Sequence, residues 1–199
     1  MKNRIGTLTT KEKIIGVTMD IIAQEGFQNI TIRKIAAKAG VNVAAVNYHF
    51  GSKDAVINEA LKTVTDQLEH IYEYLKNSNE EPKTKLALFI INYTDMMFKY
   101  PDILKNVIDH AIHNKLFDNQ IEYFTFLQTE GVGILKTVIS QIRPDLDEYD
   151  IYIKILHLLS GLSFPFLMGD QIKDMMGFDL YSGQMREMHT KMLLDNICC

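Results

Sequence analysis

Residues 31–50 read TIRKIAAKAGVNVAAVNYHF and contain two short helical patterns separated by one tight break. The hydroxyl of Thr31 can cap the first helix, because it can accept a hydrogen bond from a backbone N–H of the first turn. Gly40 is expected to end this helix, since glycine adopts the left-handed conformation at no steric cost. Asn42 is a favourable cap for a second helix over 43–49. Two helices joined by a short, glycine-containing turn are typical of the helix-turn-helix, whose second helix enters the DNA major groove.

The second helix of this pattern divides into two faces. Ala45 and Val46 can pack on the first helix, which leaves small side chains, one amide and one phenol facing outward. An asparagine can bond to adenine, small apolar groups can contact a thymine methyl, and a tyrosine can donate to a phosphate. A lysine at the start of the following helix is a further phosphate site. The candidate DNA-binding residues are Thr31, Arg33, Asn42, Val43, Ala44, Asn47, Tyr48, His49 and Lys53.

A helix–glycine–helix corner also occurs in helical proteins that do not bind DNA, so the flanking sequence matters. The run 26–56, GFQNITIRKIAAKAGVNVAAVNYHFGSKDAV, resembles the N-terminal domain of TetR-family transcriptional repressors. The resemblance covers about residues 8–68, and at Asn47 this chain departs from the tyrosine of many members. Either Asn47 or Tyr48 could therefore make the main phosphate contact. The matching residues are Gly26, Phe27, Thr31, Arg33, Ile35, Ala36, Ala39, Gly40, Val41, Tyr48, His49, Phe50, Lys53 and Asp54.

Charge is distributed unevenly along the 199 residues. Residues 1–62 hold nine Lys or Arg and five Asp or Glu, a net charge of +4, whereas the whole chain carries −4 and residues 63–199 therefore −8. A nucleic-acid surface is accordingly expected in the N-terminal third, because phosphate would repel the acidic remainder. The hydrophobic content of 47% argues against global disorder and for a sizeable core.

Several function classes receive no support from the sequence. The chain has no glycine-rich phosphate loop, HExxH, CxxC or GxSxG motif, so an enzyme is not expected. His110 and His113 have a spacing that can chelate a metal, but they lack cysteine partners, and we expect neither metal nor cofactor. The two cysteines, adjacent at the end, cannot build a disulfide framework. Without an apolar run near 18 residues or a leader segment, a cytoplasmic protein without a membrane partner is expected.

Apolar periodicity predicts an all-α chain, with no convincing strand pattern. We expect a three-helix, helix-turn-helix domain over 8–68 and a C-terminal helical domain over 69–199. Pro82, Pro101 and Pro144 mark helix boundaries in the second domain, since proline cannot continue a helical ladder. The expected helices span 11–24, 32–39, 43–49, 53–76, 82–100, 102–113, 117–142, 147–168 and 182–197.

The C-terminal domain is rich in aromatic and methionine side chains, which are typical of a plain core but also of an apolar ligand pocket. The TetR resemblance implies an effector pocket here and a homodimer joined by the last two helices. The candidate pocket residues are Tyr93, Met97, His110, His113, Phe117, Tyr123, Phe124 and Phe164. The candidate dimer-interface residues are Ile155, Leu158, Leu159, Leu162, Met185, Met188 and Met192.

Together these observations predict a homodimeric repressor that binds a palindromic operator in double-stranded DNA and is released by a small, largely apolar effector. Dimerisation also follows from the DNA hypothesis, because one short helix reads too few bases for specificity. Two alternatives remain: a small-molecule enzyme or carrier with an incidental basic helix corner, and a helical interaction module without a ligand.

Overall fold

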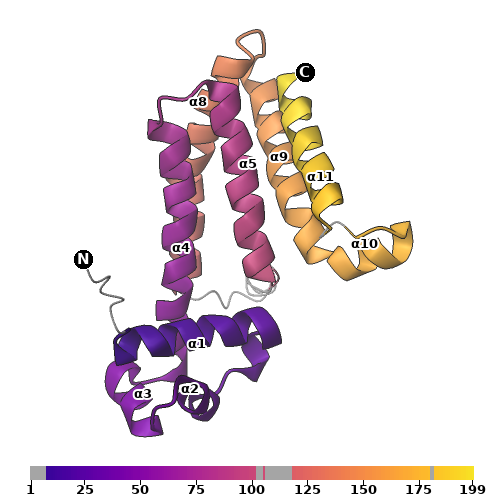
Figure 1. Cartoon of the computed structure of the whole chain (residues 1–199). Coiled ribbons are helices and arrows are strands. Elements are labelled where there is room, and N and C mark those ends of the chain that lie inside the picture. Colours follow the sequence, from indigo (N-terminus) through magenta and orange to yellow (C-terminus); the bar gives the residue numbers. More distant parts are fainter. Residues whose placement is uncertain (1–7, 102–104, 106–117, 180–181) are drawn as a thin grey trace, which may run out of the picture.

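The computed structural model describes residues 8–101, 105, 118–179 and 182–199, and within these ranges every regular element is a helix. The all-α prediction is thus confirmed for this part of the chain. Figure 1 shows α1, α2 and α3 grouped at one end of the molecule, from which α4 rises into a second group of helices. Apart from Lys105, the helix expected over 102–113 lies outside the described residues.

The N-terminal group consists of α1 (Thr10–Glu25), a single 3-10 turn η1 (Phe27–Asn29), α2 (Ile32–Ala39) and α3 (Val43–Phe50). A capping box begins α1: the Glu12 N–H donates to the Thr9 hydroxyl, and the Thr9 N–H donates to the Glu12 carboxylate at 2.8 Å. These helices enclose a small core that the sequence predicts, with Phe50 half-buried at its margin. Its buried members are Ile14, Ile21, Phe27, Ile35 and Val46.

Helix α4 (Lys53–Asn77) connects the two parts of the molecule. It begins at Ser52, whose hydroxyl accepts from the Ala55 N–H at 3.1 Å. It contacts α1 and α3 in the first part, and α5, α7 and α8 in the second. The expected division between residues 68 and 69 falls inside this continuous helix. Its buried stripe comprises Val56, Ile57, Ala60, Leu61, Val64, Thr65, Leu68, Tyr72 and Leu75.

The remaining helices build the C-terminal domain: α5 (Pro82–Lys99), α7 (Asp118–Phe126), the π-helical segment η2 (Leu127–Gly131), α8 (Val132–Ile142), α9 (Glu148–Leu167), α10 (Gly169–Met176) and α11 (Gly183–Cys198). In Figure 1, α4, α5 and α8 form one bundle, α9 and α11 run alongside it, and α10 projects from the lower end of α9. Contacts of α5 with α9 and α11, and of α8 with α9, hold the two groups together.

Two features of this domain differ from the expected helices. The single helix predicted over 117–142 is divided by the π-helical turn η2, which ends at Gly131. A Cβ on Gly131 would lie 3.1 Å from Leu127 Cδ2 and 3.3 Å from Tyr72 Cε1, so glycine permits close packing on α4. Helix α10 was not predicted, because its eight residues are too few for a clear pattern. Its Ile172 is buried and supplies the tertiary contact that stabilises it.

Candidate nucleic-acid interface

The turn between α2 and α3 is held by two side-chain caps and one glycine. The Thr31 hydroxyl accepts from a backbone N–H of α2 at 3.2 Å. The Asn42 carboxamide oxygen does the same for α3 at 2.7 Å, which leaves only its amide N–H groups for a further partner. Gly40 has a φ of 67° and a ψ of 33°, in the left-handed region that glycine adopts without strain. These local interactions determine the direction in which α3 leaves α2.

Helix α3 presents small side chains and a few polar groups to solvent. Val46 is buried against the domain core, and Ala45 is half-buried. The Tyr48 side chain is 86% exposed, and its ring meets that of the exposed His49 edge-to-face at 5.3 Å between centroids. This division of faces matches the one expected from the sequence. The exposed outward residues are Val43, Ala44, Asn47 and Tyr48.

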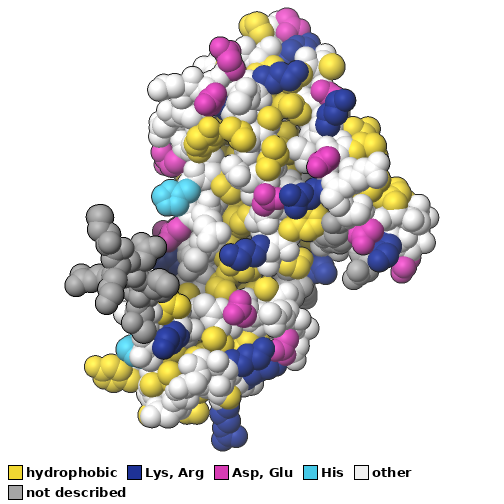
Figure 2. All heavy atoms as spheres, viewed as in Figure 1, with side chains coloured by type: hydrophobic (Ala, Val, Ile, Leu, Met, Phe, Trp, Pro, Cys, Tyr) yellow, Lys and Arg dark blue, Asp and Glu magenta, His cyan; other side chains and the backbone are white. Residues whose placement is uncertain are grey.

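The basic side chains of this domain fall into two groups. Lys34 and Lys38 both pair with Glu25, and the hydrogen bond from Lys34, followed by that from Lys38, lowers the pKa of that carboxyl. By contrast, Arg33 and Lys53 are exposed and form no ion pair with any residue that the structure describes. Figure 2 shows Lys and Arg side chains over this end of the molecule, one of which projects from its tip. The sequence alone does not distinguish the paired cations from the unpaired ones.

Comparison with known proteins identifies this arrangement. Residues 14–60, from α1 into α4, match the family described as bacterial regulatory proteins, tetR family. The chain belongs to the TetR family. A TetR-family transcriptional regulator from Marinobacter aquaeolei VT8 superposes with a TM-score of 0.71 at 14% identity, covering 95% of this chain and 99% of that chain.

Two repressors are among the relatives of this TetR-family chain. It is 24% identical over 142 residues to the HTH-type transcriptional repressor KstR2 of Rhodococcus jostii, covering 69% of this chain and 70% of KstR2. It is 22% identical over 130 residues to the HTH-type transcriptional repressor NicS of Pseudomonas putida, covering 65% of this chain and 61% of NicS. The chain is accordingly a DNA-binding transcriptional regulator, and its family and relatives are regulators rather than enzymes.

In the C-terminal domain of this TetR-family member, the structure brings two predicted pocket residues together with one that was not predicted. Tyr93 of α5 and Tyr123 of α7 lie near Tyr72 of α4, and burial raises the pKa of all three phenols. The Tyr123 hydroxyl interacts with those of Tyr72 and Tyr93, but the hydroxyls of Tyr72 and Tyr123 make no hydrogen bond of good geometry among the described residues. Rings of Phe89 and Phe126 flank Tyr72 edge-to-face, at 4.9 and 5.3 Å between centroids. We call Tyr72, Tyr93 and Tyr123 the tyrosine cluster.

The other predicted pocket residues are scattered. Met97 is buried in α5, and Phe124 of α7 is half-buried beside Tyr123. Phe164 is 55% exposed on α9 and is therefore not enclosed in the core. His110, His113 and Phe117 lie outside the described residues. Tyr72 could have been found from the sequence, because it continues the buried stripe of α4 one turn after Leu68.

The residues predicted for the dimer interface lie on two different faces. Ile155, Leu158 and Leu162 are buried in the subunit's own core, and Leu159 and Met185 are half-buried. Met188 and Met192 are exposed on α11. Helix α9 has a second apolar face that was not predicted from the sequence, and we call it the outer face of α9. Its exposed residues are Tyr149, Tyr152, Ile153 and Leu156.

Apolar residues on both faces make α9 unusual among the described helices. It is the one helix of the described chain that is long and apolar enough, by length and composition, to cross a membrane, with a mean hydropathy of 1.3 and a third of that window buried. Lys154 and His157 interrupt it, which is why the sequence contains no uninterrupted apolar run of that length. Core helices of soluble proteins meet the same criterion. The described residues contain no group of three or more His, Cys, Asp or Glu that could hold a metal ion.

Proposed function

We propose that this regulator is a homodimeric, cytoplasmic repressor that reads a palindromic operator with two copies of α3 and is released by a small, largely apolar effector. The observation that carries the proposal is the outward face of α3, with its small side chains, one carboxamide and one phenol, beside the unpaired cations Arg33 and Lys53. Small side chains allow a helix to approach base edges closely, and the cations supply the sequence-independent attraction to phosphate.

Each residue of this face has a proposed role. Asn47 reads a base edge, because a carboxamide can bond bidentately to adenine, while Val43 and Ala44 contact thymine methyl groups. Tyr48 and Lys53 contact phosphates, which sets the register of α3 without reading sequence. The remaining predicted residues contact the DNA backbone. They lie near the start of α2, at the start of α3 and at the end of α3, and are Thr31, Arg33, Asn42 and His49.

The outer face of α9 and the exposed methionines of α11 supply the proposed dimer interface. Large apolar side chains exposed on adjacent helices mark a protein contact, since water solvates them poorly. Packing these faces on the same faces of a second copy gives a closed, twofold interface. Because Ile155, Leu158 and Leu162 are already buried within one subunit, the partner would contact the outer residues, such as Ile153 and Leu156. A twofold dimer places two α3 helices on half-sites about 34–36 Å apart.

The tyrosine cluster gives the proposed effector site a polar element inside an apolar core. A buried hydrogen bond contributes about 0.5–1.5 kcal/mol when it is well formed, and an effector that offers an acceptor would supply the good geometry that the Tyr72 and Tyr123 hydroxyls lack. Tyr72 also belongs to α4, whose first turn carries Lys53. An effector that binds one position of α4 better than another would shift the separation of the two α3 helices. To shift the population from 1:99 to 99:1, the effector must bind one position of α4 more tightly than the other by about 5.5 kcal/mol.

Binding to the DNA upstream of the chain's own gene tests the proposal. Fluorescence anisotropy with a duplex from that region should give saturable binding with two chains per site, and a duplex with one half-site scrambled should bind more weakly. Equal affinity for the scrambled duplex would rule out palindrome reading. Small apolar molecules with a hydrogen-bond acceptor are then screened for release of the DNA, and Tyr72→Phe should reduce their potency.

A further inference from the structure

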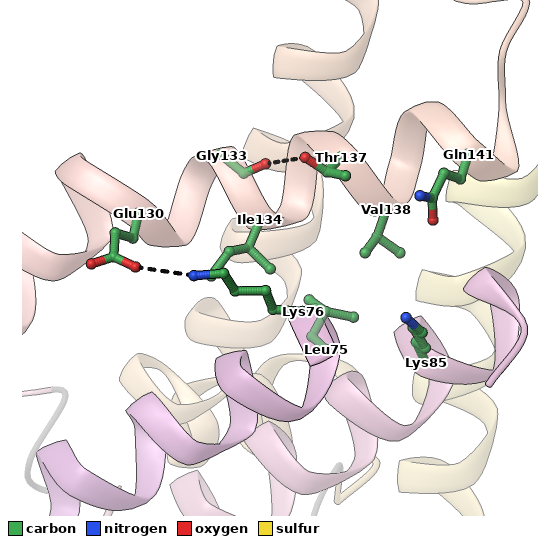
Figure 3. A pocket seen from close by; sticks show the side chains of 9 residues that line it. All are labelled: Leu75, Lys76, Lys85, Glu130, Gly133, Ile134, Thr137, Val138 and Gln141. Carbon is green, nitrogen blue, oxygen red and sulfur yellow. Dashed lines mark hydrogen bonds and ion pairs between the residues drawn. The ribbon is translucent and has the colours of Figure 1, made fainter. Parts of the chain in front are cut away.

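A groove lies at the end of the molecule farthest from α3, between the last turn of α4, the first turns of α5, and α8 with the end of η2. Its volume is about 390 Å³, within the range of small-ligand sites. Figure 3 shows Lys76 of α4 and Lys85 of α5 extending toward α8 on either side of the apolar residues. The buried side chains of Leu75, Ile134 and Val138 form its floor.

A glycine within α8 faces this groove. Gly133 has nothing within 4 Å of the position that its Cβ would occupy, so no packing contact within the described chain requires glycine there. Glycine weakens a helix interior relative to alanine, because it gives up more backbone freedom on folding. It does, however, allow another molecule to approach the helix backbone closely. Gly131, two residues earlier, differs, since its Cβ would press on Leu127 and Tyr72.

The charges around the groove favour an anion. Lys85 forms no ion pair with any described residue, although it lies beside an apolar floor. Lys76 is held only loosely by Glu130, at 3.6 Å between Nζ and Oε2, and both side chains are about half exposed. An ammonium at the edge of an apolar surface is stabilised by an anionic partner, and a partner that also has an apolar chain can cover the apolar surface beside it. Two lysines against one glutamate leave the groove with a net positive charge.

We propose that this groove is a binding site for a small amphipathic carboxylate. The carboxylate lies between Lys76 and Lys85, and its aliphatic chain covers Leu75, Ile134 and Val138 along the Gly133 backbone. The site opens to solvent and lies about one turn along α4 from the enclosed tyrosine cluster, so it is separate from the proposed effector site. It does not depend on the proposed repressor function.

Calorimetric titration of the full chain with octanoate tests the site, with octan-1-ol and octylamine as probes of charge. Octanoate should bind at one site per chain, and octylamine should bind at least about tenfold more weakly, because lysines repel its ammonium. Gly133→Leu, which fills the groove, should weaken octanoate binding by about tenfold or more, whereas Gly133→Ala should remain within about twofold. Circular dichroism and thermal unfolding confirm that each variant is folded.

A pair of lysine variants provides a second measurement that does not depend on the folding of Gly133→Leu. Lys85→Gln should weaken octanoate binding by about tenfold. Lys83→Gln removes the same charge from an exposed position of α5 outside the groove and should change binding by less than about twofold. No saturable octanoate binding to the wild-type chain, or equal effects of the two lysine variants, would overturn the proposal. A third outcome would also overturn it: the wild-type chain self-associates, does not bind octanoate, and loses its self-association in Gly133→Leu. Another copy of the chain would then occupy the groove.

Discussion

Tyr48 and Tyr72 are the same side chain in opposite surroundings. Tyr48 lies on α3 in the N-terminal domain with 86% of its surface exposed, whereas Tyr72 lies inside the C-terminal domain and is fully buried. The N-terminal domain keeps its polar groups in water, ready to meet a large charged partner. The C-terminal domain instead encloses two phenol hydroxyls that lack a well-formed partner. The first arrangement suits recognition of a surface, and the second suits a small molecule that enters a core.

The largest effect is expected where the C-terminal domain exposes apolar groups. Ile153→Glu should convert the proposed dimer to monomers and abolish operator binding, because each interface would bury two unpaired carboxylates at a cost of several kcal/mol. Analytical ultracentrifugation at micromolar protein concentration measures the molecular mass and so distinguishes monomer from dimer. Ile121→Glu is the matched control, since Ile121 on α7 is 49% exposed and Ile153 is 51% exposed. A variant Ile153→Glu that remains dimeric would place the interface elsewhere.

Substitution of the amide on α3 should have the next largest effect. Asn47→Ala should cost about 1–3 kcal/mol in operator binding if the carboxamide reads a base. Anisotropy titrations with the operator and with random DNA measure the loss on each. The loss should be confined to the operator. An equal loss on random DNA would show instead that Asn47 contacts phosphate and that Tyr48 does not carry that role alone.

The unpaired cations of the N-terminal domain should differ from the paired ones. Lys53→Gln should weaken binding to all DNA sequences and reduce the slope of log affinity against log salt by about 0.9 per copy. Lys34→Gln is the comparison, because Glu25 already neutralises Lys34. We expect Lys34→Gln to change the salt slope less than Lys53→Gln does. Equal slope changes would mean that the Glu25 pairs open when DNA binds.

The smallest effect is expected for the buried hydroxyl of Tyr72. Tyr72→Phe should leave the free energy of unfolding unchanged or raise it by about 1 kcal/mol, because it removes a buried hydroxyl whose interaction with Tyr123 lacks good hydrogen-bond geometry. Burial raises the pKa of Tyr72 above 10, so the folded state retains its proton longer than the unfolded state does. Wild-type stability should therefore fall as pH rises above about 10, and Tyr72→Phe should reduce that fall.

Urea unfolding at pH 7 and above pH 10 measures both quantities for Tyr72→Phe. Tyr48→Phe provides the control at pH 7, where it should leave the free energy of unfolding unchanged, since water already solvates that hydroxyl. A loss of stability at pH 7 in Tyr72→Phe would show that the hydroxyl makes a well-formed hydrogen bond in solution. An effector would then gain nothing by offering an acceptor group to Tyr72.

Local chemistry made the N-terminal domain predictable. Thr31, Gly40 and Asn42 act on residues within four positions of themselves, so their roles as caps and turn could be derived from sequence spacing. The exposed face of α3 followed from the same helical period. The pairing of Lys34 and Lys38 with Glu25 was missed, because it joins α2 to the end of α1 and depends on how the two helices cross.

Sequence periodicity was less informative for the C-terminal domain. It located α5, α9 and α11 to within a few residues and predicted α7, η2 and α8 as one helix. Helix α9 is apolar on two faces, and its pattern does not show which one the subunit buries. Residues Ile155, Leu158 and Leu162 were assigned to a partner contact, and the structure places them in the subunit core. Helix α10 is short and is stabilised by Ile172, a contact with no local signature.

The sequence by itself determined the helical class, the caps and turn of the helix-turn-helix, and the residues that α3 presents to solvent. These depend on hydrogen bonds and periodicities that operate within a few residues. Only the tertiary structure decided which face of α9 remains exposed, which cations stay unpaired, and that three tyrosines from α4, α5 and α7 converge. Those outcomes depend on packing between helices far apart in the chain, where the available space and neighbouring charges are set by the assembled core.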